Sequence, residues 1–113
     1  MAVQPLSHKL SALLTNARDE AGERAALKQY VCESRDVLLR YHRHGMGGLH
    51  FGAFYARVMD VLLEELWRRA VKKIKLPAHD AERAGLLALG SFGLRQLSLY
   101  SDLDILLLHD GLD

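Results

Sequence analysis

Two aspartates, Asp102 and Asp104, flank a single residue just before an apolar run near the end of the chain. Side chains alternate along a β-strand, so residues at this spacing point to the same face, about 7 Å apart. Carboxylate oxygens are ligands that Mg²⁺ prefers, and Mg²⁺ held by one or two carboxylates also binds substrate phosphates. The pair therefore predicts a magnesium site in which Asp102 and Asp104 are the metal ligands and the catalytic carboxylates.

A glycine-serine turn precedes this pair. The apolar run 86–89 stops at Gly90, as a buried strand does when it ends in a tight turn. Ser91 supplies a hydroxyl donor, and Gly93 lets the backbone approach a ligand. The N–H groups that enter a short helix expected near 92–97 are suited to bind phosphate. Together with the carboxylates, the turn predicts a site for a nucleoside triphosphate and its metal ions, which activate an attacking hydroxyl and stabilise phosphate charge.

Two apolar runs, 86–89 and 105–108, are the strands expected to position this site. The second run is apolar on both alternating faces, which is typical of a strand in a sheet that is covered on both sides. A sheet of two strands is only marginally stable alone. We therefore expect the helices of the chain, a partner or further strands to cover it.

Helical periodicity dominates the chain before the strands. Three ranges carry apolar residues at helical spacing and are expected to be helices: 5–17, 23–42 and 51–74. Polar residues and Gly22 make 16–22 the expected flexible joint, and the glycines of 45–48 end the second helix. Pro77 is expected to stop the third helix and to open a polar linker over 77–85. The sequence thus predicts an α+β chain with a helical first part.

Three histidines, His42, His44 and His50, surround the glycine-rich turn at 45–48. A structural zinc site needs four ligands at fixed geometry, and no cysteine or carboxylate is spaced to complete one. We therefore interpret these histidines as polar residues at a helix end, where a charged imidazole suits the helix dipole.

Composition limits the kind of partner that the protein binds. Fifteen basic and fourteen acidic residues give a formal net charge of +1. This balance argues against a general nucleic-acid or membrane-surface binder. The single cysteine, Cys32, cannot form an internal disulfide, and the sequence has no signal peptide and no apolar run of about 18 residues. These features predict a soluble, cytoplasmic protein.

The turn and the aspartate pair carry a family resemblance. The residues concerned are Gly90, Ser91, Phe92, Gly93, Leu97, Tyr100, Ser101, Asp102, Leu103 and Asp104. Their pattern resembles the nucleotidyltransferase signature of the polymerase-beta type, and most closely the N-terminal part of the bacterial protein-PII uridylyltransferase/uridylyl-removing enzymes. Upstream helical segments are similar to the lead-in of those enzymes, so the resemblance covers roughly residues 25–113.

The resemblance implies a fold, a reaction and a set of site residues. The fold is a helical lead-in packed on the first strands of a nucleotidyltransferase sheet, with a helix and joint over 1–22, the lead-in over 23–76 and the start of the transferase domain over 77–113. The reaction transfers UMP from UTP to a tyrosine of the nitrogen-regulatory PII protein. Mg²⁺ is held by Asp102, Asp104 and a third carboxylate, and the nucleotide is contacted by Gly90, Ser91, Gly93, Arg95 and Ser101.

The chain also departs from the family pattern. Many relatives carry Gly-Arg-Gly-Glu or Gly-Arg-Arg-Glu where this chain has Gly-Leu-Arg-Gln over 93–96, so one cation and one carboxylate are replaced. Arg95 is interpreted as a phosphate or backbone partner. The family places its third carboxylate on a later strand, and the sequence ends at Asp113, so we expect a truncated domain that is inactive alone.

Two other hypotheses remain open at this level. One is a different nucleotidyltransferase, which would prefer ATP to UTP. The other is a non-catalytic helical module whose apolar stripe over 51–74 binds a partner helix. The module would show no metal-dependent nucleotide binding, and its self-association would be lost when Leu62 and Leu66 become polar.

Overall fold

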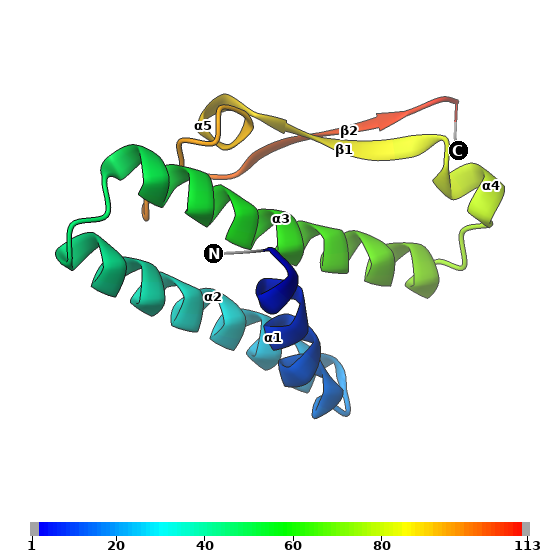
Figure 1. Cartoon of the computed structure of the whole chain (residues 1–113). Helices are drawn as coiled ribbons and strands as arrows, with labels where there is room; N and C mark the ends of the chain where they lie inside the picture. Colours follow the sequence, from blue (N-terminus) through cyan, green and yellow to red (C-terminus); the bar gives the residue numbers. More distant parts are fainter. Residues whose placement is uncertain (1–2, 112–113) are drawn as a thin grey trace.

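Residues 3–111 form three long helices, a two-stranded sheet and two single-turn helices (Figure 1). The computed structural model describes residues 3–111, so the outermost residues of the first and last predicted segments lie outside the described residues. In chain order the elements are α1 (Val3–Thr15), α2 (Glu20–Arg43), α3 (Gly48–Lys73), α4 (Ala78–Ala81), β1 (Ala84–Leu89), α5 (Gly90–Gly93) and β2 (Asp104–His109). The predicted mixture of helix and strand is therefore confirmed, and helix dominates.

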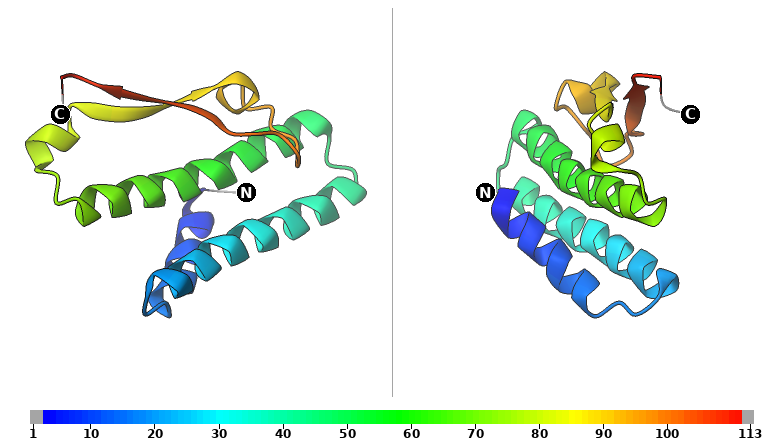
Figure 2. Two further views of the ribbon diagram at one scale, coloured as in Figure 1. Left: turned by 180° about the vertical axis from the view of Figure 1, so that it is seen from behind. Right: turned by 90° about the vertical axis from the view of Figure 1, so that its right-hand side faces the viewer.

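The elements form layers, with α3 in the middle. Figure 2 shows α1 and α2 on one side of α3 and the β1–β2 hairpin on the other. The main core lies between the three helices, where Tyr30 and Leu38 of α2 and Val58 of α3 are fully buried. The Tyr30 hydroxyl donates a hydrogen bond of 2.9 Å to the Val58 carbonyl, which joins α2 to α3 inside this core. One face of α3 thus belongs to the helical core and the other is available to the hairpin.

The start of α2 differs from the sequence prediction. The Asp19 side chain accepts a hydrogen bond of 2.7 Å from the Gly22 backbone N–H, which is the usual arrangement of an aspartate that caps a helix N-terminus. This cap lets α2 begin at Glu20 instead of residue 23. The expected flexible joint over 16–22 is consequently a short turn followed by a capped first helical turn.

The end of α3 also has a different cause from the one predicted. The helix ends at Lys73, Lys75 adopts a left-handed backbone with φ of 55°, and the Leu76 N–H donates to the Val71 carbonyl at 3.0 Å. This pattern of a left-handed residue with a backward hydrogen bond is a common helix C-terminus. Pro77 lies beyond this end and is the N-cap residue of α4, so the helix ends before it reaches the proline that was predicted to stop it.

The sheet consists of two antiparallel strands, β1 and β2. Their register pairs Ala84 with His109 at one end and Leu89 with Asp104 at the other. Every residue of β2 is exposed, and Leu107 has 55% of its surface accessible. Both apolar runs are strands, as predicted, but the expected cover on both faces is not provided by residues 3–111. Within that range, each helix is too short or too polar to cross a lipid bilayer.

Candidate functional site

The glycine-serine turn lies next to one of the two aspartates, at the end of the hairpin where β1 stops and β2 starts. β1 ends at Leu89, which is paired with Asp104, the first residue of β2. Gly90 follows with a left-handed φ of 59°, and a Cβ atom placed on it would lie 2.7 Å from Oδ2 of Asp104. The left-handed backbone therefore favours glycine at position 90, and a side chain there would have to push the Asp104 carboxylate aside. Gly90 and Asp104, which are 14 residues apart in the sequence, are therefore neighbours in the structure.

The helix that follows the turn is shorter than predicted. It spans Gly90–Gly93 instead of the expected range 92–97. Arg95 has a left-handed φ of 60°, and the Gln96 N–H folds back to the Ser91 carbonyl at 2.8 Å. The left-handed residue ends the helix after one turn, so the predicted short helix begins two residues earlier than expected and ends at Gly93.

Gly93 has a packing reason to be glycine. A Cβ atom on Gly93 would lie 2.7 Å from the Ala88 carbonyl oxygen, because α5 folds back onto the end of β1. Phe92 points into the protein and is only 2% exposed. This close packing fixes the turn to the strand, and it explains the glycine without a ligand.

Ser101 and Asp102 lie in the loop that precedes β2. The Ser101 hydroxyl accepts from the Ser98 N–H at 3.0 Å and shares a hydrogen bond of 2.8 Å with the Ser98 hydroxyl. Ser101 thus closes a turn in the loop. Asp102 is exposed and lies before the strand. The alternation of side chains along a strand therefore determines the direction of Asp104 but does not apply to Asp102. The loop conformation decides how close the two carboxylates come.

Arg95 has a partner that sequence reasoning missed. Its guanidinium forms a two-pronged ion pair with Asp60 of α3, with a distance of 3.0 Å from Nη1 to Oδ1 and a second contact from Nη2 to Oδ2. These hydrogen bonds raise the pKa of Arg95. The guanidinium also lies over the Phe92 ring, 5.6 Å from its centre. Arg95 was predicted to contact phosphate, and its guanidinium is instead engaged with Asp60.

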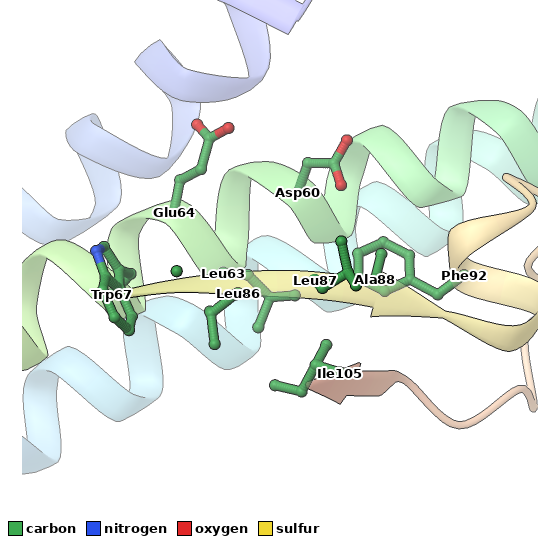
Figure 3. Close-up of a pocket in the computed structure, with 10 residues that line it drawn as sticks. Asp60, Leu63, Glu64, Trp67, Leu86, Leu87, Ala88, Phe92 and Ile105 are labelled. Carbon is green, nitrogen blue, oxygen red and sulfur yellow. The ribbon is translucent and has the colours of Figure 1, made fainter. Parts of the chain in front are cut away.

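A cavity of about 260 Å³ lies between α3 and the hairpin (Figure 3). Its walls are mainly apolar, with Leu63 and Trp67 from α3 and Leu86 and Ile105 from the strands, and Asp60 lies at its edge. None of the predicted metal or nucleotide ligands lines it. The cavity is a gap in the packing beneath the hairpin, and the predicted site lies at the hairpin's end.

Potential metal ligands are sparse among residues 3–111, where no group of three or more histidine, cysteine, aspartate or glutamate side chains gathers. His42, one of the three histidines at the glycine-rich turn, hydrogen-bonds through Nδ1 with the Met46 carbonyl at 2.8 Å and packs its ring against Phe51. A set of two exposed carboxylates still suits Mg²⁺, which keeps several waters and takes further oxygens from substrate phosphates. The donor chemistry of Asp102 and Asp104 therefore fits this ion.

The chain is 30% identical over 83 residues to a bifunctional uridylyltransferase/uridylyl-removing enzyme of Nitrosospira multiformis, covering 74% of this chain and 8% of that protein. It is 34% identical over 89 residues to the enzyme of the same name from Ectopseudomonas mendocina, covering 79% of this chain and 9% of that protein. No family model and no solved structure matches.

These matches cover most of the chain but only a small part of each relative. The chain spans less than a tenth of the length of either curated enzyme. The resemblance predicted from the glycine-serine turn and the aspartate pair is confirmed: this chain is similar to part of the bifunctional uridylyltransferase/uridylyl-removing enzymes.

Proposed function

We propose that the end of the hairpin is part of a metal-nucleotide site for uridylyl transfer, in which UMP passes from UTP to a tyrosine of the PII protein. The observation that carries this proposal is the contact between Gly90 and the Asp104 carboxylate. The contact brings a carboxylate beside a turn whose backbone has no side chain in the way, and this carboxylate would be a ligand of the metal. The name of the two relatives supports UMP as the group that is transferred. The choice of PII as the acceptor follows from the family resemblance of the turn and the aspartate pair.

Each residue of the site has a distinct task in this proposal. Asp104 is fixed at the start of β2 by its pairing with Leu89, and Asp102 lies two residues earlier, in the loop before the strand. These two carboxylates would hold Mg²⁺, which when bound stabilises phosphate charge and makes a hydroxyl easier to deprotonate. Gly90 and Ser91 would contact the triphosphate, with the Ser91 hydroxyl as a donor to a phosphate oxygen.

The reaction itself needs no covalent chemistry from the protein. The tyrosine hydroxyl loses its proton to water, its oxygen forms a bond to the α-phosphorus of UTP, and the bond from that phosphorus to pyrophosphate breaks. The task of the chain is to position groups and stabilise charge. Binding of the magnesium complex of UTP is therefore the first property to measure.

The test is a calorimetric titration of the chain with UTP in the presence and absence of Mg²⁺. Replacement of Asp102 or Asp104 by asparagine should weaken Mg²⁺-dependent UTP binding by at least about tenfold, or about 1.4 kcal/mol. Asp110→Asn is the matched control, because Asp110 lies at the opposite end of the hairpin and faces Arg83 at 3.7 Å. Undiminished binding by both active-site variants, or an equal loss in the control, would reject the proposal.

The same titration with ATP distinguishes the second enzyme hypothesis. A uridylyltransferase should bind UTP more tightly than ATP, and a preference for ATP would favour a different nucleotidyltransferase. Both results leave the metal-binding roles of Asp102 and Asp104 intact, because the phosphates are common to the two nucleotides.

A non-catalytic interaction module is favoured by one observation on α3. Leu66 is 39% exposed, and it lines a groove between α2 and α3 together with Leu27 and Leu62. An exposed apolar groove between helices is suited to a partner helix. This hypothesis requires that UTP does not bind at all, and that Leu66→Lys reduces self-association measured by analytical ultracentrifugation.

A further inference from the structure

The loop between α5 and β2 decides where Asp102 stands, yet it has no regular secondary structure from residue 94 to residue 103. Asp104 is fixed by its strand pairing, but Asp102 has no such support. A catalytic carboxylate must be held within a fraction of an ångström of its working position. The contacts that hold this loop are therefore part of the site's design.

The first contact is the ion pair between Asp60 and Arg95. A guanidinium and a carboxylate that meet through two parallel hydrogen bonds fix both their separation and their relative plane. The left-handed backbone of Arg95, which is unfavourable for a residue with a Cβ atom, turns the side chain toward α3. Such a conformation persists only where its surroundings enforce it.

Three further contacts attach the middle of the loop to the helices. The Cα of Gln96 is so close to α3 that a Cβ on Gly52 would lie 3.0 Å from it. Leu97 is buried, with 2% of its surface exposed. The Leu99 carbonyl lies 3.5 Å from Nη2 of Arg35, whose Nε donates to the Tyr55 hydroxyl at 2.6 Å. Residues 95–99 of the loop are thus held against α2 and α3.

We propose that Asp60 and Arg95 are positioning residues, which hold the loop against α3 and so set the place of Asp102 relative to Asp104 and Gly90. Arg95 stands at the start of the loop, ahead of the contacts that Gln96 and Leu97 make, so the ion pair fixes the direction in which the loop leaves α5. The inference rests on the proposed function in one respect, which is that Mg²⁺ and UTP are the ligands that bind at Asp102 and Asp104. The restraint on the loop is a property of the chain alone and can be measured without nucleotide.

Three variants separate charge from geometry in this pair. Asp60→Asn keeps the shape and removes the charge, and Arg95→Lys keeps the charge but removes the two-pronged geometry. The exchange of the two residues, Asp60→Arg with Arg95→Asp, restores an ion pair, and aspartate tolerates the left-handed backbone at position 95 better than most residues. Asp80→Asn is the control. Asp80 also faces an arginine, with 3.9 Å between its Oδ1 and Nη1 of Arg83, but this pair does not touch the loop.

Amide hydrogen exchange tests the restraint itself. Asp60→Asn should speed exchange in residues 96–103 by about tenfold or more, while the amides around Tyr30 and Leu38 in the helical core keep their protection. The charge exchange should slow the loop again. Unchanged exchange in the loop, or an equal increase in the core, would overturn the proposal.

Binding of Mg²⁺ and UTP tests the consequence for the site. Removal of a residue that orients a metal ligand typically weakens metal affinity by about ten- to a hundredfold. We expect such a loss in Asp60→Asn, a smaller loss in Arg95→Lys, partial recovery in the charge exchange and none in Asp80→Asn. Equal affinity in a variant whose loop is demonstrably loose would refute the positioning role.

The two measurements also keep the two proposals apart. If the unaltered chain binds no nucleotide in the presence of Mg²⁺, the proposed function fails, and hydrogen exchange alone decides whether the pair holds the loop. If the unaltered chain binds and the variants bind equally well, the proposed function stands and the positioning role is wrong.

Discussion

A Cβ atom placed on Gly90 would lie 2.7 Å from Oδ2 of Asp104, so a side chain at position 90 would have to displace that carboxylate. Gly90→Ala should therefore cost at least about 1 kcal/mol for the left-handed backbone alone. It should also displace the Asp104 carboxylate, because a methyl group would overlap Oδ2. Urea unfolding measures the first effect, and the Mg²⁺-dependence of UTP binding measures the second.

Gly85→Ala is the matched control in the same hairpin. Gly85 lies in β1 and a Cβ placed on it meets nothing within 4 Å. Its substitution should leave both stability and binding almost unchanged. Equal effects of the two substitutions would show that the contact between Gly90 and Asp104 is not what matters.

Phe92 and Leu94 provide a second prediction from neighbouring positions. Phe92 is 2% exposed and Leu94 is 69% exposed, although only one residue separates them. Phe92→Ala should lower the free energy of unfolding by about 3–5 kcal/mol because it leaves a cavity beneath the turn. Leu94→Ala should change it by no more than about 0.5 kcal/mol. Chemical denaturation of the two variants decides whether the turn is packed as the structure shows.

Gly52→Ala tests how firmly the loop rests on α3. Alanine in a helix interior is favoured over glycine by about 1 kcal/mol, so a loose loop would let this substitution stabilise the protein. The atoms that a new methyl group would meet are backbone atoms of Gln96 and Leu97 at 3.0–3.2 Å. We therefore expect destabilisation. Gly48→Ala, at the open start of α3, is the comparison, and a rise in melting temperature for Gly52→Ala would contradict a firmly seated loop.

Tyr30 predicts how stability changes at alkaline pH. Burial, with a smaller contribution from the charge of Asp60, raises the pKa of Tyr30 well above its ordinary value of 10.0. Above that value the unfolded chain loses the phenolic proton while the folded chain keeps it. Stability is therefore full below pH 10.0 and falls as the pH rises toward the folded pKa.

Tyr30→Phe isolates this effect. The variant should lose about 0.5–1.5 kcal/mol at neutral pH, because the hydrogen bond to the Val58 carbonyl is gone. Its stability should then decline less steeply above pH 10.0 than that of the unaltered chain. Parallel pH profiles from urea unfolding would show that Tyr30 does not control the alkaline limit.

Local sequence patterns were sufficient to locate the main elements. The two apolar runs and the three stretches of helical periodicity correspond to β1, β2, α1, α2 and α3, since these patterns depend only on which residues must be buried. Element ends were less predictable. The left-handed conformation of Lys75, and not Pro77, ends α3. This end could not be predicted, because nothing in the sequence indicates that a lysine adopts that conformation.

The arrangement of the site required tertiary information. Residue types predicted Gly90 and Asp104 as members of one site, and their contact supports that grouping. The partner of Arg95 could not be predicted, because Asp60 lies 35 residues away in a helix whose own pattern gives it no special role. The placement of Asp102 likewise depends on a loop whose conformation is set by contacts with α3. Roles for the individual ligands of metal and nucleotide remain predictions.

The exposed leucines of β2 have a consequence for the behaviour of the chain in concentrated solution. A short apolar strand with solvent on its faces resembles the segments that stack into cross-β aggregates, and β2 holds no lysine, arginine or proline to oppose this. Aggregation should therefore begin at the hairpin while the helices are still native. The strands that carry the proposed site are therefore also the part of the chain at which we expect irreversible aggregation to begin during purification.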